Sequence, residues 1–134
     1  MPDAIPVEFQ EKRRLLYGKG MAARRAAVAG KLADAGRLAE SLEYLERDRD
    51  AAALGRVRRE AVRAGDGFSL VRSCQLLRAE PDPSEWRELA ANAEGAGKWY
   101  DAVNALERAG DAEKAEAVRA ARCPGFRPFK PAGK

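Results

Sequence analysis

The sequence contains a repeated pattern, and this pattern constrains the fold more than any other feature. Residues 35–58, AGRLAESLEYLERDRDAAALGRVR, align with residues 96–119, AGKWYDAVNALERAGDAEKAEAVR. A third copy lies between them and keeps the same order of apolar residues around one aspartate. Its positions match the first copy as follows: Leu70, Cys74, Leu77, Asp82, Trp86 and Leu89 match Leu38, Leu42, Leu45, Asp50, Leu54 and Val57. We expect such a chain to form a stack of equivalent units.

Each copy has the spacing of two helices joined by a turn. The first three apolar positions lie four and three residues apart, and the last two lie three apart, so each group shares one face of a helix. Asp50, Asp82 and Asp111 stand where the second helix begins, where a side chain can accept a backbone N–H. Glycines such as Gly65 and Gly97 stand where helices must end. Each copy is therefore predicted to be a helical hairpin.

Composition agrees with an all-α fold. Alanine, arginine and glutamate are frequent, whereas β-branched and aromatic residues are few, which favours helix outside the glycines and prolines. We predict an α-solenoid of about four stacked antiparallel hairpins, the first of them divergent, with about eight short helices. These cover 7–17, 21–35, 37–47, 50–64, 68–79, 83–95, 98–109 and 111–122. Residues 1–122 would form one helical-repeat domain, and residues 123–134 a basic tail rich in proline.

The copies resemble tetratricopeptide-like helical repeats over about residues 35–122. The best-matched copy carries the resemblance at Trp99, Leu106, Gly110, Asp111, Ala115 and Val118. The resemblance implies a non-enzymatic scaffold or adaptor. Such a protein binds a peptide or protein partner on the concave surface that the first helices line, and the resemblance does not identify that partner.

Polar residues beside the apolar positions of the first helices form the candidate groove. Equivalent positions hold Glu40, Glu43 and Arg47, then Arg72 and Gln75, then Asp101, Asn104 and Arg108. Carboxamides and mixed charges can hydrogen-bond an extended or helical ligand. The same residues also suit a solvated helix face, so both interpretations stand. Trp99 is expected in the core, whereas Tyr44 and Tyr100 have no place in the apolar pattern and either can serve as an exposed interface anchor.

A second candidate surface is basic. Arg49, Arg56, Arg59 and Arg63 recur at helical spacing on the predicted fourth helix, and the sequence pI is about 9.3. Such a stripe can contact an acidic protein or the phosphates of nucleic acid. Glu60 interrupts it, the net charge is only +4, and no aromatic residues lie between the arginines to stack on bases. A solvated face, an acidic partner and nucleic acid stay open, with nucleic-acid binding as the alternative function.

Patterns for catalysis and metal binding are lacking. Histidine is absent, which removes the commonest general base and the commonest metal ligand. Cys74 and Cys123 stand in unlike contexts, so no disulfide framework is indicated. No glycine-rich phosphate-binding loop and no cluster with metal-ligand spacing occurs in the sequence. We therefore expect no catalytic residue, no cofactor, no metal and no enzymatic activity; a cofactorless enzyme that uses carboxylates is a distant third option after the adaptor and the nucleic-acid-binding module.

The tail CPGFRPFKPAGK contains prolines that forbid helix, together with Phe126 and Phe129. These phenylalanines either cap the apolar end of the last hairpin or form a short motif that another protein binds. No apolar run approaches the roughly 18 residues that a membrane span needs, so we expect a cytoplasmic protein without such a span. The alanine- and arginine-rich composition is typical of a GC-rich bacterial genome. Apolar edges at both ends make a homo-oligomer a further option.

Overall fold

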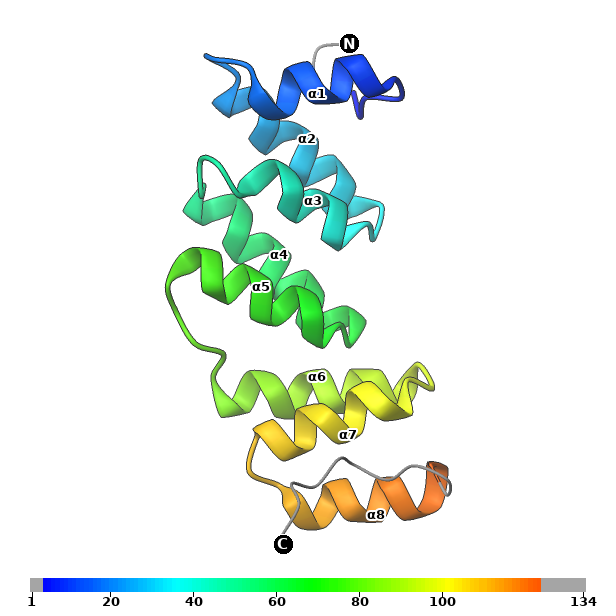
Figure 1. Ribbon diagram of the computed structural model, residues 1–134. Helices are drawn as coiled ribbons and strands as arrows, with labels where there is room; N and C mark the ends of the chain where they lie inside the picture. Colours follow the sequence, from blue (N-terminus) through cyan, green and yellow to red (C-terminus); the bar gives the residue numbers. More distant parts are fainter. Residues whose placement is uncertain (1–3, 124–134) are drawn as a thin grey trace, which may run out of the picture.

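The computed structural model describes residues 4–123, which form eight α-helices. Their bounds are α1 (Phe9–Tyr17), α2 (Ala22–Asp34), α3 (Leu38–Leu45), α4 (Ala51–Ala64), α5 (Gly67–Leu77), α6 (Pro83–Gly95), α7 (Trp99–Arg108) and α8 (Ala112–Arg122). The helices stack in chain order, with α1 at one end and α8 at the other (Figure 1). The predicted all-α stack of helical hairpins is confirmed, and the predicted helix ends lie within two residues of the observed ones. Phe126 and Phe129 fall outside the described residues.

Glycines in the left-handed conformation end helices where the chain turns back. Gly65 (φ 70°) follows α4, and Gly97 (φ 75°) follows α6. A residue with a Cβ would lose about 1–2 kcal/mol in this conformation. In the first of these turns the N–H of Asp66 donates to the carbonyl of Ala61 at 2.9 Å, and the turn after α6 closes with the same type of bond. The predicted helix ends at both glycines are confirmed.

The aspartates predicted to begin the second helices stand at the N-cap positions of α4, α6 and α8. Asp50 accepts a backbone N–H of α4 at 2.9 Å, and Asp82 forms a reciprocal capping box with Glu85. The side chain of Asp111 makes no such bond. Its backbone ψ is 59°, against 114° at Asp50 and 144° at Asp82, and its carboxylate lies 3.4 Å from Nε of Arg87 instead. The side-chain cap is therefore confirmed at Asp50 and Asp82 and wrong at Asp111.

Two rows of helices run along the stack, and they are packed differently (Figure 1). The closest pairs are α2–α3, α4–α5, α6–α7 and α7–α8, because tight turns fold these consecutive helices onto each other. The repeat alignment pairs α3 with α4, α5 with α6 and α7 with α8. The close pairs α2–α3, α4–α5 and α6–α7 are therefore shifted by one helix from the hairpins of the repeat. In one row, α2 packs on α4 and α4 packs on α6. In the other row, α3 packs on α5. Within residues 4–123, α1 with α3 and α5 with α7 make at most marginal contact.

The core contains the predicted apolar positions and one position that the alignment missed. Leu42 and Leu54 are 2% exposed or less. Tyr44 is also 2% exposed, which corrects the prediction of an exposed anchor, and its counterparts Leu76 and Ala105 are buried too. Helix α3 packs against α2, α4 and α5. It therefore buries a wider arc than the single stripe that a surface helix needs.

Trp99 is only partly buried, although the repeat alignment predicts it at the core position of Leu38 and Leu70. Arg122 of α8 lies over its ring, with the guanidinium carbon 4.7 Å from the ring centre. Among the described helices, α7 packs closely only on α6 and α8. The ring therefore meets a cation at the end of the stack rather than the apolar face of a further helix.

A buried arginine ties the N-terminal helices together. Arg25 of α2 is 3% exposed. Its guanidinium donates to the carbonyls of Leu15 and Gly18 at 3.0 and 2.8 Å and to the carboxylate of Asp48 at 2.6 Å. The bond from Arg25 holds the pKa of Asp48 below its usual range. This one side chain thus fixes the end of α1 to α2 and to the link that precedes α4.

Candidate functional site

The candidate site is a cleft between α5 and α7, where close packing along the second row is lost. Helix α5 is followed by Arg78, whose backbone is left-handed (φ 57°). Pro81 lies in the link to α6, and Pro83 is the first residue of α6. Proline cannot continue a helix and favours extended backbone at the residue before it. The link is therefore extended, and α5 hardly touches α6 (Figure 1). An opening of about 570 Å³ results.

The floor of this cleft is apolar. Val71 and Cys74 come from α5, and Trp86 comes from the first turns of α6. Cys74 and Trp86 are 1% and 4% exposed, so the floor is continuous with the core. Pro81 and Pro83 line the end of the cleft at the link. Tryptophan is among the residue types most enriched at binding hot spots, which makes this floor suitable for an apolar side chain of a partner.

Polar side chains stand at the rim. Arg108 of α7 lies over Trp86, with its guanidinium carbon 5.2 Å from the ring centre. No carboxylate within residues 4–123 forms an ion pair with this guanidinium. Gln75 of α5 is exposed and accepts a long hydrogen bond of 3.4 Å from Arg72. Stacking on the indole orients the planar guanidinium, whose N–H groups match a carboxylate.

Two titratable groups lie at or next to the cleft floor in unreactive forms: Cys74, which lines the floor, and Glu85, which precedes Trp86 in α6 but does not line the cleft. Nε of Arg58 donates to Oε2 of Glu85 at 2.7 Å, and this bond holds the pKa of Glu85 below its usual range. The carboxylate is therefore ionised and already engaged. Burial raises the pKa of the Cys74 thiol, so the reactive thiolate is scarce at neutral pH. Neither Glu85 nor Cys74 is therefore held as a free base or as a ready nucleophile.

The structure distributes the predicted groove residues over several places. Gln75 and Arg108 meet at the α5–α7 cleft. Glu43 and Arg47 line another cleft, between α1 and α3. Arg72 is ion-paired where α3 and α5 are in contact. The continuous groove that the repeat suggests is thus divided by the contact of α3 with α5.

The remaining predicted groove residues lie elsewhere on the surface. Glu40 accepts a hydrogen bond of 2.8 Å from Arg37, which lowers the pKa of Glu40. Tyr100, Asp101 and Asn104 are exposed on α7 but are not among the residues that line the cleft. Helix α7 therefore contributes to the cleft with its C-terminal end, through Arg108.

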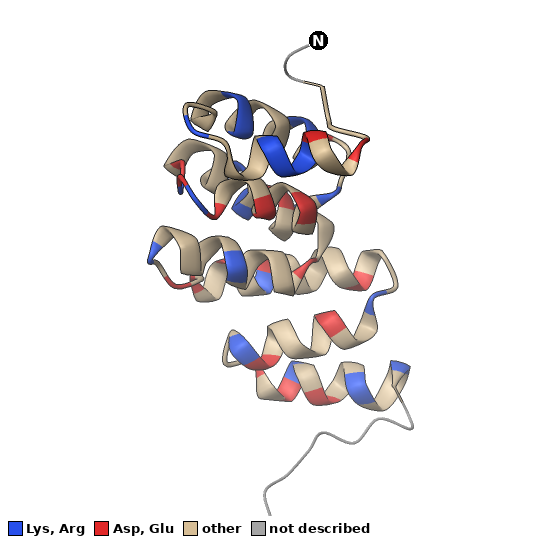
Figure 2. Ribbon diagram, turned by 45° about the horizontal axis from the view of Figure 1, so that its top comes forward, with Lys and Arg blue, Asp and Glu red and all other residues tan. Residues whose placement is uncertain are grey.

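The predicted basic face is interrupted by acidic partners. Arg56 pairs with Asp34, and Arg63 pairs with a glutamate of its own helix at 3.2 Å. Arg59 is exposed on the same helix. Arg49 precedes α4 and has a left-handed backbone (φ 50°), so its predicted place on that helix is wrong; the capping residue that follows sets the helix start. Figure 2 shows blue and red residues interleaved along the helices rather than one continuous basic face.

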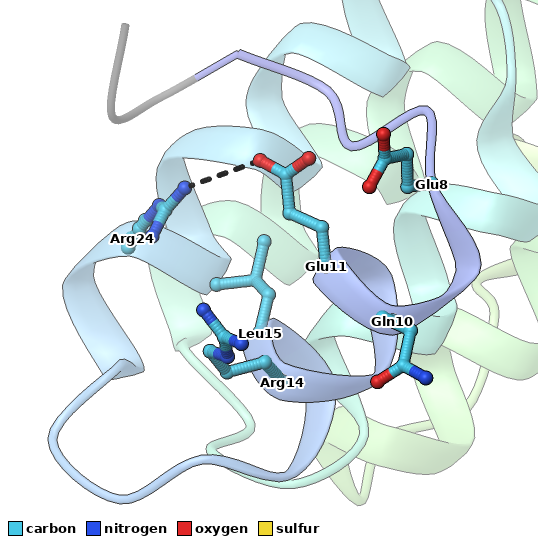
Figure 3. A pocket seen from close by; sticks show the side chains of 6 residues that line it. All are labelled: Glu8, Gln10, Glu11, Arg14, Leu15 and Arg24. Atoms are coloured by element: carbon cyan, nitrogen blue, oxygen red, sulfur yellow. Dashed lines mark ion pairs between the residues drawn. The ribbon is translucent and has the colours of Figure 1, made fainter.

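A third opening, of about 280 Å³, lies beside α1 (Figure 3). Arg24 reaches Glu11 across it at 3.8 Å, and Leu15 is the one apolar residue among the described residues that line it. This volume is slightly below the range usual for small-molecule sites. Among residues 4–123, no three acidic or cysteine side chains gather as a metal site would need. No helix in this part of the chain is long and apolar enough to cross a membrane.

In comparisons with known proteins, no family model, no curated protein and no solved structure matches the chain.

The sequence pattern does not predict that Trp86 lines a cleft. Trp86 matches Leu54 in the repeat, which indicates a core position and conceals its second role as the floor of a cleft. The signal that could have located the site is Pro81-Asp82-Pro83. Pro81 in this link and Pro83 directly after it predict an extended connection, and an extended connection separates helices that would otherwise pack.

Proposed function

We propose that this protein is a non-enzymatic adaptor that binds a peptide or protein partner in the α5–α7 cleft. The observation that carries the proposal is Arg108 stacked over Trp86 at the edge of an opening of about 570 Å³. An apolar side chain of the partner would contact Trp86 and Val71. A carboxylate or backbone carbonyl beside it would accept hydrogen bonds from Arg108. Gln75 can both donate to and accept from a peptide backbone.

The packing of the rows supports the same proposal. Helices α3 and α5 pack on each other, whereas α5 and α7 leave a cleft at the equivalent place. A segment of a partner would there replace the contact that a neighbouring helix makes elsewhere. This mode of binding also agrees with the resemblance to tetratricopeptide-like repeats, whose first helices line the binding surface.

The alternative, nucleic-acid binding through α4, has weaker support. Arg49 and Arg59 are exposed and could contact phosphates. Arg56 and Arg63 are ion-paired with carboxylates, and these pairs would have to be broken before either side chain met a phosphate.

Affinity capture with the full chain as bait tests the proposal. Capture is run at low and high salt, with nuclease added to a parallel arm. The cleft variant Gln75→Ala/Arg108→Ala is compared with the basic-face variant Arg59→Ala/Arg63→Ala. The four side chains are exposed, so both variants should keep the fold, and circular dichroism checks this.

With the wild type or the basic-face variant as bait, a discrete partner protein should remain bound at high salt and after nuclease treatment. The cleft variant should retain at least about tenfold less of it, because arginine is among the residue types most enriched at binding hot spots and Arg108 is the hydrogen-bond donor that the proposal assigns to the partner. If nucleic acid is captured instead, and its amount falls at high salt and with the basic-face variant as bait, nucleic-acid binding through α4 is favoured. Recovery of no discrete protein, or equal recovery by the cleft variant, would refute the proposed site.

A further inference from the structure

One side of α1 lines a second cleft, whose other wall is α3. The side chains on this side follow the helical spacing i, i+3, i+4, i+7 and i+8. They are Phe9, Lys12, Arg13, Leu16 and Tyr17. Two adjoining openings of about 620 and 550 Å³ share Leu16, Tyr17 and Glu43. Together these openings form the α1–α3 groove.

Large apolar side chains are exposed at this groove. Phe9 is 75% exposed and Tyr17 is 70% exposed, whereas Leu15 on the other side of α1 is 1% exposed. Helix α1 makes at most marginal contact with α3. Aromatic side chains gathered on one uncovered helix face are typical of an interaction surface.

The α1–α3 groove is held in shape by bonds between its walls. Nζ of Lys12 lies 3.0 Å from the carboxylate of Glu43. Nη1 of Arg47 donates to the backbone carbonyl of Tyr17 at 2.7 Å. These bonds link the two walls without filling the space between them. The groove is therefore preformed, which lowers the entropy cost of binding.

The charge that remains in the groove is positive. Its two carboxylates, Glu43 and Glu46, are each paired with a basic residue at 3.0 Å. Arg13 and Arg47 line the same groove, and no carboxylate in residues 4–123 forms an ion pair with either. A partner with acidic side chains would supply the missing counterions.

We propose that the α1–α3 groove binds an acidic amphipathic helix of another protein, at a site separate from the α5–α7 cleft. Apolar side chains of that helix lie against Phe9 at one end of the groove and against Leu16 and Tyr17 at the other. A carboxylate between them pairs with Arg13. This order of apolar, acidic and apolar positions is complementary to the order along α1 and follows the helix-in-groove mode of recognition.

The dimensions and shape of the groove favour a helix. At 1.5 Å per residue, α1 and α3 are about 13 and 12 Å long, so the groove accommodates about two to three turns of a partner helix. A convex helix can enter between two walls. A flat lipid surface would meet the exposed Phe9 but would not reach Leu16, which is partly buried between the walls.

A display library of randomised helices of about four turns provides the probe, with the full chain as bait. An excess of the Arg13→Glu variant in solution competes for peptides that bind outside the α1–α3 groove and so removes them from the immobilised wild type. Enriched peptides should carry acidic residues flanked by apolar ones at i, i+3 or i+4, and i+7. Phe9→Ala and Arg13→Glu should each weaken the best peptide about 10- to 100-fold in fluorescence anisotropy. Arg14→Glu is the matched control, since it makes the same charge change at a neighbouring exposed residue that does not line the groove.

Failure to enrich any peptide, or enrichment of peptides without the acidic pattern, overturns the proposal. An equal effect of Arg14→Glu and Arg13→Glu overturns it as well. Binding that Arg108→Ala abolishes would place the peptide in the α5–α7 cleft, which overturns this inference and leaves the proposed function intact. Phe9-dependent binding to vesicles of phosphatidylserine and phosphatidylcholine would assign the groove to a membrane. Phe9-dependent self-association in sedimentation would assign it to a second copy of the chain.

Discussion

Replacement of Gly65 by alanine tests how closely α4 and α6 approach in their row. Gly65 is buried and left-handed (φ 70°). A Cβ at this position would lie 2.8 Å from Cα and 2.9 Å from the backbone nitrogen of Ala93. These atoms belong to the backbone of α6, which cannot rotate away as the end of a flexible side chain can. The substitution must therefore push the end of α4 away from α6.

The magnitude follows from a comparison with Gly97. Gly97 is also left-handed (φ 75°), but no atom lies within 4 Å of a Cβ placed there. Gly97→Ala should cost the conformational strain of about 1–2 kcal/mol, less about 0.4–1 kcal/mol for a more restricted unfolded chain. We expect a net loss of about 1 kcal/mol. Gly65→Ala adds the cost of overpacking, about 1–3 kcal/mol, for a total of about 2–4 kcal/mol.

Urea unfolding followed by circular dichroism measures both variants against the wild type. The free energy of unfolding should fall clearly further for Gly65→Ala than for Gly97→Ala, with similar dependence on urea. Equal losses in the two variants would mean that only backbone strain is present at Gly65. The close approach of α4 to α6, and with it the packing of that row, would then be refuted.

Three further predictions concern the charged and thiol groups. Arg25→Met leaves Asp48 and two backbone carbonyls without their donor, so urea unfolding should show a loss of about 2–4 kcal/mol; an unchanged midpoint would contradict these bonds. The folded pKa of Glu85 lies below its unfolded value because Arg58 binds the carboxylate, so its contribution to stability is complete above the unfolded pKa and is lost as pH falls through the lower folded pKa. Thermal unfolding between about pH 7 and 3 should therefore depend less on pH in Glu85→Gln, and identical profiles would count against the pair. Cys74 should react with a thiol-specific disulfide reagent much more slowly in the native protein than in urea, and comparable rates would mean that the cleft floor is open to solvent.

The helices and turns could be predicted from the sequence because their causes are local. Three or four residues separate successive apolar positions, and a glycine such as Gly65 or Gly97 ends a helix through its own backbone conformation. The capping box of Asp82 and Glu85 likewise lies within four consecutive residues. Patterns of this range are visible in a single sequence.

Burial and the site depend on contacts that the repeat does not encode. Tyr44 is outside the apolar stripe but buried, because α3 is covered by helices on more than one side. Arg108 and Trp86 belong to different helices and meet only through the packing of α6 with α7. The repeat pattern predicts Gln75 and Arg108 as groove residues, but the cleft between them depends on how far the link after α5 separates α5 from α6.

Two links of equal length explain why the site lies where it does. Residues 46–50 join α3 to α4, and residues 78–82 join α5 to α6, with five residues in each link. The first begins with a helical residue, Glu46, and leaves α3 in contact with α4. The second begins with the left-handed Arg78, contains Pro81 and is followed by Pro83, and it separates α5 from α6. The repeat therefore supplies the apolar surfaces, and a local departure from it exposes one of them as a candidate binding site.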